Sequence, residues 1–564
     1  MNEVRDVLSR AVQAAYDESV DIELTRTDPQ FGDFACNVAL QLAKKVGQNP
    51  RAVAEKILDS LPTNDLIDSV AVAGPGFINI RLTNTSLVRA LSDHVTNDPR
   101  GFASNDIGKG STIICEFPSP NMAKPFSVGH IRSALQGWAL YKLMERCGYK
   151  VIRDNHIGDY GTPFGKWVVG FLRYSSKDKL QQDGVYELAR VYIAITADMK
   201  HEKQQGVTKT ADEVQDWLVK LEHGDKEAKA YSKQFNQISL DHMHHVMDRL
   251  RIETDEELGE SHYVKRGQEL VDELLKKGIA KHSEGAVIVP LDDVGIDTPI
   301  MLRKANGAAL YATTDLATIE YRQKHWNPSK VFIHTGQEQV FYFEQLKALA
   351  KKAGYKDTIV HLWHGIVDQL NDEGEREKMS SRKGVVLLEE LLDTAQAKAV
   401  ELTKDGTAND ADAVALGAIK FLDFKADRKT GILFDWESIF NVHGFSGPAV
   451  QYAIVRIQSI LQKADLHGAP KPNKEYDWSE EHALLLELAQ FPGLIMELHD
   501  TYELQKLAHY VYGLAQELNR YYEKVRVLES DEPARQARLW LLTLVSEVMS
   551  TSLDILGIPV PEKM

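Results

Sequence analysis

Apolar residues recur at helical spacing along most of this chain, and short runs of β-branched residues interrupt that pattern at a few places. The run Thr112 to Glu116 predicts a strand that leads into a proline-broken loop, and a new helical pattern begins at His130. A second predicted strand, Tyr149 to Asn155, precedes the glycine-rich segment HIGDYGTPFG. This order predicts one half of an open parallel sheet, with ligand-binding loops at the carboxyl ends of its strands.

A second half of the sheet is predicted from about residue 285 to residue 375. Within it, ALYATTDLA predicts a short strand and then a helix capped near Thr314 or Asp315. KVFIHTGQEQVFYFEQL predicts a strand, a glycine turn and an amphipathic helix. Residues 171–260, between the two halves, are charged and helical, and beyond Val385 the pattern is almost wholly helical.

The first 85 residues predict a separate small α/β unit. Helical periodicity covers Val4 to Tyr16, and two further helices follow, with Asn49-Pro50 at the start of the second. VAVAGPGFINIRL then alternates as a strand around a Gly-Pro-Gly turn. A chain of 564 residues is expected to hold about three to four domains.

Composition constrains the compartment more than the function. The chain has 66 basic and 82 acidic residues, a net charge of −16, which argues only weakly against a nucleic-acid partner because phosphate contacts need only a local basic face. Three separated cysteines without a C-x-x-C pair form neither a disulfide framework nor a thiolate zinc site, so a reducing cytosol is expected. No segment is typical of a membrane span, and the N-terminal segment predicts an amphipathic helix rather than a secretion signal.

The segment DHMHH, residues 241–245, raises the question of a metal site. On one helix His242 and His245 could share a face, but no fixed carboxylate or thiolate accompanies them. A solvated or surface-packed helix is therefore the preferred interpretation.

The stretch EFPSPNMAKPFSVGH, residues 116–130, has the chemistry of a polyphosphate site. The first turn of a helix offers unpaired N–H groups, Gly129 removes a side chain, and Lys124 and His130 add donors. The four residues SVGH alone are also compatible with a helix cap or a buried histidine. The whole stretch resembles the first nucleotide-binding signature of class I aminoacyl-tRNA synthetases, in the form typical of arginyl-tRNA synthetases. Ser127 stands at the first histidine of that signature.

The segment EKMSSRKGV, residues 377–385, predicts a basic, mobile surface loop. It resembles the second class I signature in the variant K-M-S-x-R-x-G, with Ser381 in place of the second lysine. The resemblance to arginyl-tRNA synthetases covers nearly the whole chain. It includes GDFACNVALQLAK and AGPGFIN near the N-terminus, HIGDYGTPFG, GES at residues 259–261, YATTDLA, GFSGPAVQYAIVRI and the C-terminal RLWLLTLVSEVMSTSLDILGIPVPEKM. We assign no role to Glu260 from the sequence.

The resemblance implies a multidomain α/β protein. A Rossmann-like, parallel-sheet catalytic domain would span residues 86–385 and contain a connective helical insert at 171–260. A small α/β domain at 1–85, which binds tRNA in this family, would precede it. A helical linker at 386–435 and an all-α anticodon-binding bundle at 436–564 would follow it.

The resemblance also implies the residues of the site. Two carboxylates and a phenol suit the guanidinium of arginine, and two amides suit its amino and carboxylate groups. Arginine binding is expected at Glu116, Asn121, Tyr311, Asp315 and Gln339, and catalysis at Lys124, Ser127, His130 and Lys378. ATP binding is expected at Pro120, Lys124, Ser127, Gly129, His130, Lys378, Met379, Ser380 and Lys383. Binding of tRNA is expected at Lys44, Arg51, Tyr452, Arg456, Tyr521 and Arg526.

The implied reaction is attack of the arginine carboxylate on the α-phosphate of ATP, with Mg²⁺, and transfer of the arginyl group to tRNA(Arg). We expect a monomeric cytoplasmic enzyme without a protein-only metal site. We also expect no editing site in residues 171–260, because buried acids can reject lysine or citrulline by about 10⁴-fold or more. Two rivals stay open: a synthetase-like protein that binds tRNA or arginine in a regulatory role, and a different nucleotidyltransferase with a similar phosphate loop.

Overall fold

The structure is a computed structural model that describes residues 2–97, 101–122, 125–305, 310–370, 375–379, 387–403, 406–464, 470, 472 and 475–564. Side chains are described for these residues except 2, 94–97, 162, 222, 370, 377 and 378. The chain forms two compact units. One contains Met1–Asn105, Tyr452–Tyr502 and His509–Ser552, and the other contains Asp106–Gln451, Glu503–Ala508 and Leu553–Met564. The domain boundaries proposed from the sequence stay predictions.

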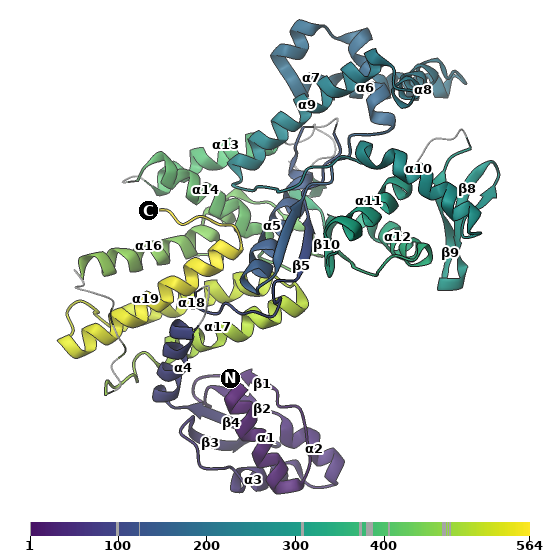
Figure 1. Ribbon diagram of the computed structural model, residues 1–564. Coiled ribbons are helices and arrows are strands. Elements are labelled where there is room, and N and C mark those ends of the chain that lie inside the picture. The colour runs from purple at the N-terminus through teal and green to yellow at the C-terminus, as the bar shows by residue number, and fades with distance from the viewer. Residues whose placement is uncertain are drawn as a thin grey trace. The chain divides into compact units, whose positions relative to one another are not determined.

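The second unit is built on a parallel sheet of four strands in the order β11-β10-β5-β6. Figure 1 labels the two central strands, β5 and β10. These strands are β5 (Thr112–Glu116), β6 (Lys150–Asp154), β10 (Lys330–Gly336) and β11 (Ile359–His364). The chain winds outward from β5 to β6 and outward from β10 to β11, so β5 and β10 are the neighbours at which the strand order reverses. Open α/β sheets bind ligands beyond the carboxyl ends of the strands at such a switch point. The strand predicted at residues 112–116 is confirmed.

Helices flank this sheet and bury its apolar side chains. They are α5 (Val128–Arg146), α10 (Glu260–Lys276), α11 (Tyr311–His325) and α12 (Val340–Ala353). Figure 1 shows α11 and α12 beside β10. The shared core includes Ile114, Leu270, Leu316, Val331 and Leu346. This packing fixes the ends of the strands, where the candidate site lies.

Two predictions for the second half of the sheet are wrong. Helix α11 begins at Tyr311 rather than near Thr314 or Asp315, because the Thr314 hydroxyl donates a hydrogen bond to the Tyr311 carbonyl inside the helix, at 2.9 Å. Residues 281–303 do not join the parallel sheet. They form a separate antiparallel sheet of β7 (Lys281–Ser283), β8 (Ala286–Leu291) and β9 (Ile296–Arg303).

The segment between the two halves of the sheet is helical, as predicted. It comprises α6 (Thr162–Tyr174), α7 (Lys177–Gln204), α8 (Lys209–Glu222) and α9 (Lys226–Arg249). Non-helical backbone at Gly184 (φ 51°) puts a kink in α7. Trp167, Phe171, Leu188 and Phe235 belong to a core that also includes Met122 and Ile157, from the loops after β5 and β6.

After β11 the second unit continues with a small sheet and more helices. The sheet contains β12 (Val367–Leu370), β13 (Arg376–Lys378) and β14 (Ile432–Leu433), and the helices are α13 (Leu388–Ala399), α14 (Ala408–Asp423) and α15 (Trp436–Phe440). Lys420 on α14 is fully buried, and its Nζ donates to the carbonyls of Leu250 and Gly557, at 2.5 and 2.6 Å. Helix α14 therefore holds both the end of the insert and the C-terminal segment.

The first unit begins with an antiparallel sheet in the order β1-β2-β4-β3. Its elements are β1 (Leu24–Arg26), β2 (Phe34–Cys36), β3 (Ile67–Ala73) and β4 (Phe77–Leu82), with α1 (Asn2–Tyr16), α2 (Val38–Val46), α3 (Pro50–Asp59) and α4 (Asn84–Asn97). The Asn49 side chain accepts from the Arg51 N–H at 2.9 Å and caps α3. The helix start predicted at Asn49-Pro50 is thus confirmed.

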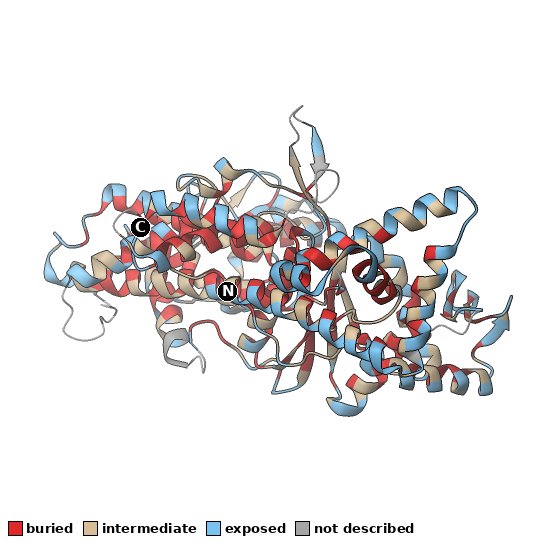
Figure 2. Ribbon diagram, turned by 90° about the horizontal axis from the view of Figure 1, so that it is seen from above, coloured by how far each residue is buried: buried red, intermediate tan, exposed pale blue. Residues whose placement is uncertain are grey.

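The late part of the chain is helical, as its periodicity predicts. Its helices are α16 (Gly447–Lys463), α17 (His482–Thr501), α18 (Gln505–Lys524) and α19 (Glu532–Ile555). Buried positions alternate with exposed ones along the helices (Figure 2). Within the first unit, His482 connects the two parts of the sequence, since its Nε2 lies 2.8 Å from Asp33 Oδ1 and its Nδ1 lies 2.6 Å from Asn84 Oδ1. No described helix is long and apolar enough to cross a membrane.

Candidate active site

The N-terminus of α5 forms the candidate nucleotide cradle. Ser127 is its N-cap residue, and the Ser127 backbone N–H donates to His130 Nδ1 at 3.1 Å. Because Nδ1 accepts this hydrogen bond, a neutral His130 carries its proton on Nε2. The ring also stacks on Phe126, with 5.1 Å between centroids. The imidazole is thus fixed beside a helix turn whose N–H groups and dipole favour phosphate.

Buried contacts hold α5 against the sheet and the segment after β11. Arg132 is 1% exposed; its Nε donates to Asp423 Oδ1 at 2.6 Å, and its Nη1 donates to the carbonyls of Gly365 and Thr430 at 3.0 and 2.9 Å. At Gly137 an added Cβ would lie 2.4 Å from the ring of Phe117, so only glycine permits this approach. The cradle therefore sits on a rigid helix.

A cluster of polar side chains lies on α11, α12 and the loop after β6. The Tyr342 hydroxyl donates to Asp315 Oδ2, while Asp315 Oδ1 lies 3.6 Å from His156 Nε2. Burial alone would lower the pKa of His156, but the carboxylates of Asp315 and Glu116 raise that pKa to about 9. Burial and Asp315 raise the pKa of Tyr342 well above its ordinary value. The carboxylate of Asp315 is therefore held between a neutral phenol and a cationic imidazole.

Glu116 is engaged by a cation of the protein itself. Its Oε2 lies 2.6 Å from Arg322 Nη2, and Arg322 Nε donates to Asp154 Oδ2 at 2.9 Å. Glu116 and Asp154 are partners in the register of β5 and β6. Arg322 therefore contacts two carboxylates that lie side by side at the ends of neighbouring strands. Glu116 and Asp154 thus share one cation, and the prediction that Glu116 binds a guanidinium group stays a prediction.

The site contains Glu260, an acidic residue to which we assign no role from the sequence. It opens α10 and is 7% exposed, and burial together with the charge of Asp315 raises its pKa to about 8. Asp159, in the loop after β6, fixes this helix start, because Ser261 donates to its carboxylate through N at 2.8 Å and through Oγ at 2.6 Å. From the sequence, Glu260 is recognisable only as an acidic residue at the start of a helix. Its position near Asp315 becomes visible only in the folded structure.

Other predicted arginine-binding residues lie at the same edge of the sheet. Asn121 is exposed and forms a bridge with Gly158, where an added Cβ would lie 2.2 Å from Asn121 Oδ1. Gln339 is exposed in the short turn between β10 and α12. Tyr311 precedes Asp315 by one turn of α11 and is 53% exposed. The loops after β5 and β10 therefore carry the two predicted amides, and the first turns of α11 carry the predicted phenol and one predicted acid.

The rest of the predicted ATP site is described only in part. Pro120 is buried, and its carbonyl accepts from the Gly158 N–H at 3.1 Å. Met379 is buried, and its N–H donates to the Val367 carbonyl at 3.0 Å. Lys378 ends β13, and only its backbone is described. Lys124, Ser380 and Lys383 lie outside the described residues, as does the predicted mobile loop from residue 380 onward.

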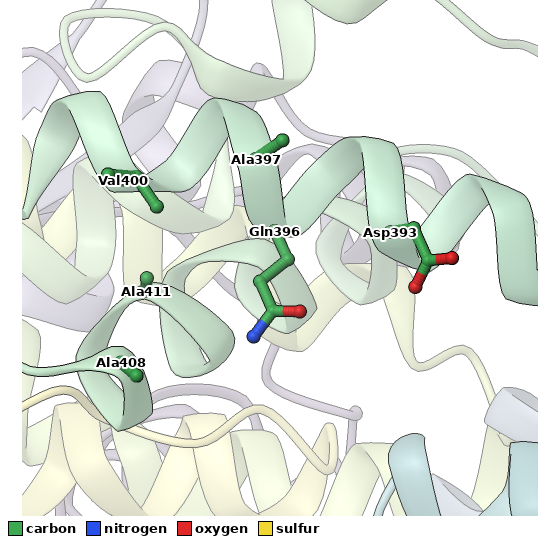
Figure 3. Close-up of a pocket in the computed structure, with 6 residues that line it drawn as sticks. All are labelled: Asp393, Gln396, Ala397, Val400, Ala408 and Ala411. Carbon is green, nitrogen blue, oxygen red and sulfur yellow. The ribbon is translucent and has the colours of Figure 1, made fainter.

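A pocket between α13 and α14 is separate from these residues. It is lined by Asp393, Gln396, Ala397, Val400, Ala408 and Ala411 (Figure 3). None of the predicted ATP-binding or arginine-binding residues lines it, and we assign it no ligand.

The predicted tRNA contacts all lie in the first unit. Lys44, Arg51 and Arg526 are exposed, and Tyr452 is 44% exposed. Arg456 is exposed, and its guanidinium lies 4.4 Å from the centroid of the Tyr522 ring.

Tyr521 departs from its predicted role at the tRNA. It is 5% exposed, and its hydroxyl donates to Glu481 Oε1 at 3.0 Å. Tyr521 is therefore part of the helical core and cannot stack on a base without opening that core.

Known proteins resemble this chain over its whole length. It is 34% identical over 562 residues to the arginine–tRNA ligase of Streptococcus pneumoniae strain CGSP14, covering 97% of each chain, and the ligase of strain TIGR4 matches equally well. The solved Thermus thermophilus arginyl-tRNA synthetase shares the fold with a TM-score of 0.81, 24% identity and all of both chains covered. The Plasmodium falciparum arginyl-tRNA synthetase structure has a TM-score of 0.79 at 21% identity, over 100% of this chain and 99% of that one.

The candidate nucleotide site lies at the switch point of a parallel sheet, with a helical insert between the halves of that sheet, and this arrangement fits a class I aminoacyl-tRNA synthetase. Residues 94–436 match the family model of the class I (R) tRNA synthetase catalytic domain. Residues 450–564 match the model of the DALR anticodon binding domain, and residues 2–82 match the model of the arginyl-tRNA synthetase N-terminal domain. The chain belongs to the arginyl-tRNA synthetase family.

Proposed function

We propose that this protein ligates L-arginine to tRNA(Arg) with ATP, through arginyl-adenylate, and releases pyrophosphate and AMP. The observation that carries the proposal is the carboxylate of Asp315, 20% exposed and oriented by Tyr342, at the edge of the sheet that also bears the α5 cradle. An acid held in this way suits the planar donors of a guanidinium group.

At the nucleotide, the chain aligns ATP and stabilises the negative charge that spreads over the reacting α-phosphate. Ser127, the first-turn N–H groups of α5 and the proton on His130 Nε2 would donate to phosphate oxygens. Lys124 and Lys378 would add positive charge. Mg²⁺ would enter with the triphosphate, and we assign it no ligand from the chain.

At the amino acid, we propose Asp315 and Glu260 as the acidic partners of the guanidinium, with the Tyr311 hydroxyl beside them. Asn121 and Gln339 would take the amino and carboxylate groups, which must point toward the cradle for the carboxylate to reach the α-phosphate. Glu116 would act indirectly, through its ion pair with Arg322 at the ends of β5 and β6.

Two measurements test the proposal together. Arginine-dependent exchange of ATP with labelled pyrophosphate, measured both in the presence and in the absence of tRNA(Arg), should appear in at least one of the two conditions. The tRNA(Arg) should be charged with arginine but not with lysine. The absence of both exchange and charging would leave the regulatory, non-catalytic alternative.

Replacing His130 by glutamine should lower kcat for pyrophosphate exchange by about a hundredfold, because one preorganised donor to the transition state is lost. The KM for arginine should stay within about twofold. His282 on β7 is exposed, so His282→Gln is the matched control and should keep full activity. A kcat of His130→Gln equal to that of the control would remove His130 from the mechanism.

Arginine binding should release a proton from Glu260. The pKa of this carboxyl is about 8 in the free site, above its ordinary value of 4.5, so it holds a proton at pH 7 and loses it when a guanidinium arrives. Arginine affinity should therefore rise as the pH passes through about 8. Calorimetry in two buffers of different ionisation enthalpy measures the release, which should vanish in Glu260→Gln and persist in the exposed control Glu284→Gln.

For the tRNA, we propose contacts at Lys44 and Arg51 in the N-terminal part, and at Tyr452, Arg456 and Arg526 in the helical part. These side chains combine positive charge with an exposed ring, which suits phosphates and unpaired bases. We further propose that the protein acts as a cytoplasmic monomer and that residues 171–260 contain no editing site.

A further inference from the structure

The DHMHH segment of α9 contacts carboxylates on two other segments of the second unit. His244 Nε2 lies 2.9 Å from Glu257 Oε2, and His245 Nε2 lies 3.1 Å from Glu389 Oε1. No group of three or more metal-ligating side chains occurs among the described residues. One of these histidines, His245, therefore connects the helical insert to α13.

Glu389, in the first turn of α13, is contacted by three residues of the insert. The Tyr186 hydroxyl on α7 donates to Glu389 Oε2 at 2.8 Å, opposite the contact of His245 with Oε1. Arg249, at the end of α9, donates to the Glu389 carbonyl at 3.4 Å and lies 2.7 Å from Asp393 one turn later. Figure 3 labels Asp393 on α13. Residues of the insert thus contact both carboxylate oxygens of Glu389 and its backbone carbonyl.

The other side of the same helix start contacts the nucleotide cradle. Leu387 forms an antiparallel bridge with Ser127, and the Leu388 N–H donates to the Phe126 carbonyl at 3.4 Å. Ser127 caps α5, and Phe126 stacks on His130. The start of α13 therefore lies between the insert and the residues that we propose to bind phosphate.

We propose that Tyr186, His245 and Arg249 are positioning residues for ATP: through Glu389 they fix the start of α13, which in turn holds Ser127 and Phe126 in place. This inference rests on the proposed role of Ser127 and His130 at the triphosphate. It gives the insert a part in the adenylation step.

The expected change in the KM for ATP depends on how far these contacts are exposed to solvent, because exposed ion pairs are weak. The side chains of His245 and Glu389 are 58% and 27% exposed. This pair alone should therefore change the equilibrium constant for ordering the start of α13 by less than about fivefold. Three residues act on one glutamate, however, and a network restrains a helix start more than one pair does. Loss of the Glu389 carboxylate, which also accepts the Tyr186 hydrogen bond, should raise the KM for ATP about tenfold.

Steady-state pyrophosphate exchange with the full chain tests the proposal. Glu389→Gln should raise the KM for ATP about tenfold and leave the KM for arginine within about twofold. Glu390→Gln is the matched control, because Glu390 is exposed in the same turn of α13. His245→Gln should raise the KM for ATP, whereas His245→Lys, which places an ammonium group beside Glu389, should restore it.

A double variant separates this network from a general loss of structure. Glu389→Gln with His245→Gln should be no worse than Glu389→Gln alone, because both changes remove one interaction. An unchanged KM for ATP in Glu389→Gln, or equal rises for ATP and arginine, would overturn the inference while leaving arginine-dependent exchange intact. Loss of exchange in the wild-type chain would instead contradict the proposed function.

Discussion

Replacing Asp315 by asparagine should lower kcat/KM for arginine by about a thousandfold, because a partly buried, hydrogen-bonded charge partner is removed from a cationic ligand. Asparagine keeps the volume of the side chain, but its amide group places N–H donors against the donors of the guanidinium. The KM for ATP should stay within about threefold, since the cradle on α5 is unchanged. Pyrophosphate exchange at varied arginine and ATP concentrations measures both quantities.

Two further variants sharpen this test. Asp297 on β9 is exposed, so Asp297→Asn should behave as the wild type. Tyr342→Phe removes the donor to Asp315 Oδ2 but keeps the ring, and it should raise the KM for arginine about tenfold. Equal losses for ATP and arginine in Asp315→Asn would indicate a damaged fold, and an unchanged kcat/KM would exclude Asp315 from the arginine site.

Local sequence patterns predicted the elements of the site well where local rules decide them. The β-branched run at residues 112–116 became β5, and the turn residues after it became the loop before α5. The start of α11 was missed because Thr314 and Asp315 have strong capping preferences that tertiary partners override. The Thr314 hydroxyl bonds within the helix, and Asp315 accepts from Tyr342 on α12.

The charge partners of the site could not be read from the sequence. Arg322 looks like an ordinary residue in the last turn of a helix, yet it pairs with Glu116 at the end of β5. Glu260 stands in a short GES segment, and only the fold brings it near Asp315. Pairings between distant segments depend on the topology of the sheet, which local periodicity does not fix.

The ion pairs and hydrogen bonds of Glu116 and Asp315 bear on how the proposed pocket would select arginine. Glu116 shares the single cation of Arg322 with Asp154, and Asp315 lies between the hydroxyl of Tyr342 and the imidazolium of His156. We propose that the selectivity for arginine rests on Asp315 with Glu260. Arg322 supports the site by allowing two carboxylates to sit together at the ends of β5 and β6.

Replacing Arg322 by methionine should destabilise the second unit by about 3–5 kcal/mol, because two buried carboxylates lose their only shared cation among the described residues. The side chains of Arg322, Glu116 and Asp154 are 4%, 8% and 1% exposed, so water cannot replace the lost contacts. Urea unfolding followed by circular dichroism measures the change. Arg303→Met is the control: Arg303 pairs with the exposed Asp272, and its loss should cost less than about 1 kcal/mol.

A further variant separates the electrostatic part of the stability loss in Arg322→Met from the part that is due to lost packing. Adding Glu116→Gln and Asp154→Asn to Arg322→Met removes both uncompensated charges while it keeps the volumes, so part of the stability should return. If the triple variant is no more stable than Arg322→Met, the cost comes from packing and the electrostatic account of this strand end is wrong. If Arg322→Met itself unfolds at the same urea concentration as Arg303→Met, the buried ion pairs contribute nothing to the fold.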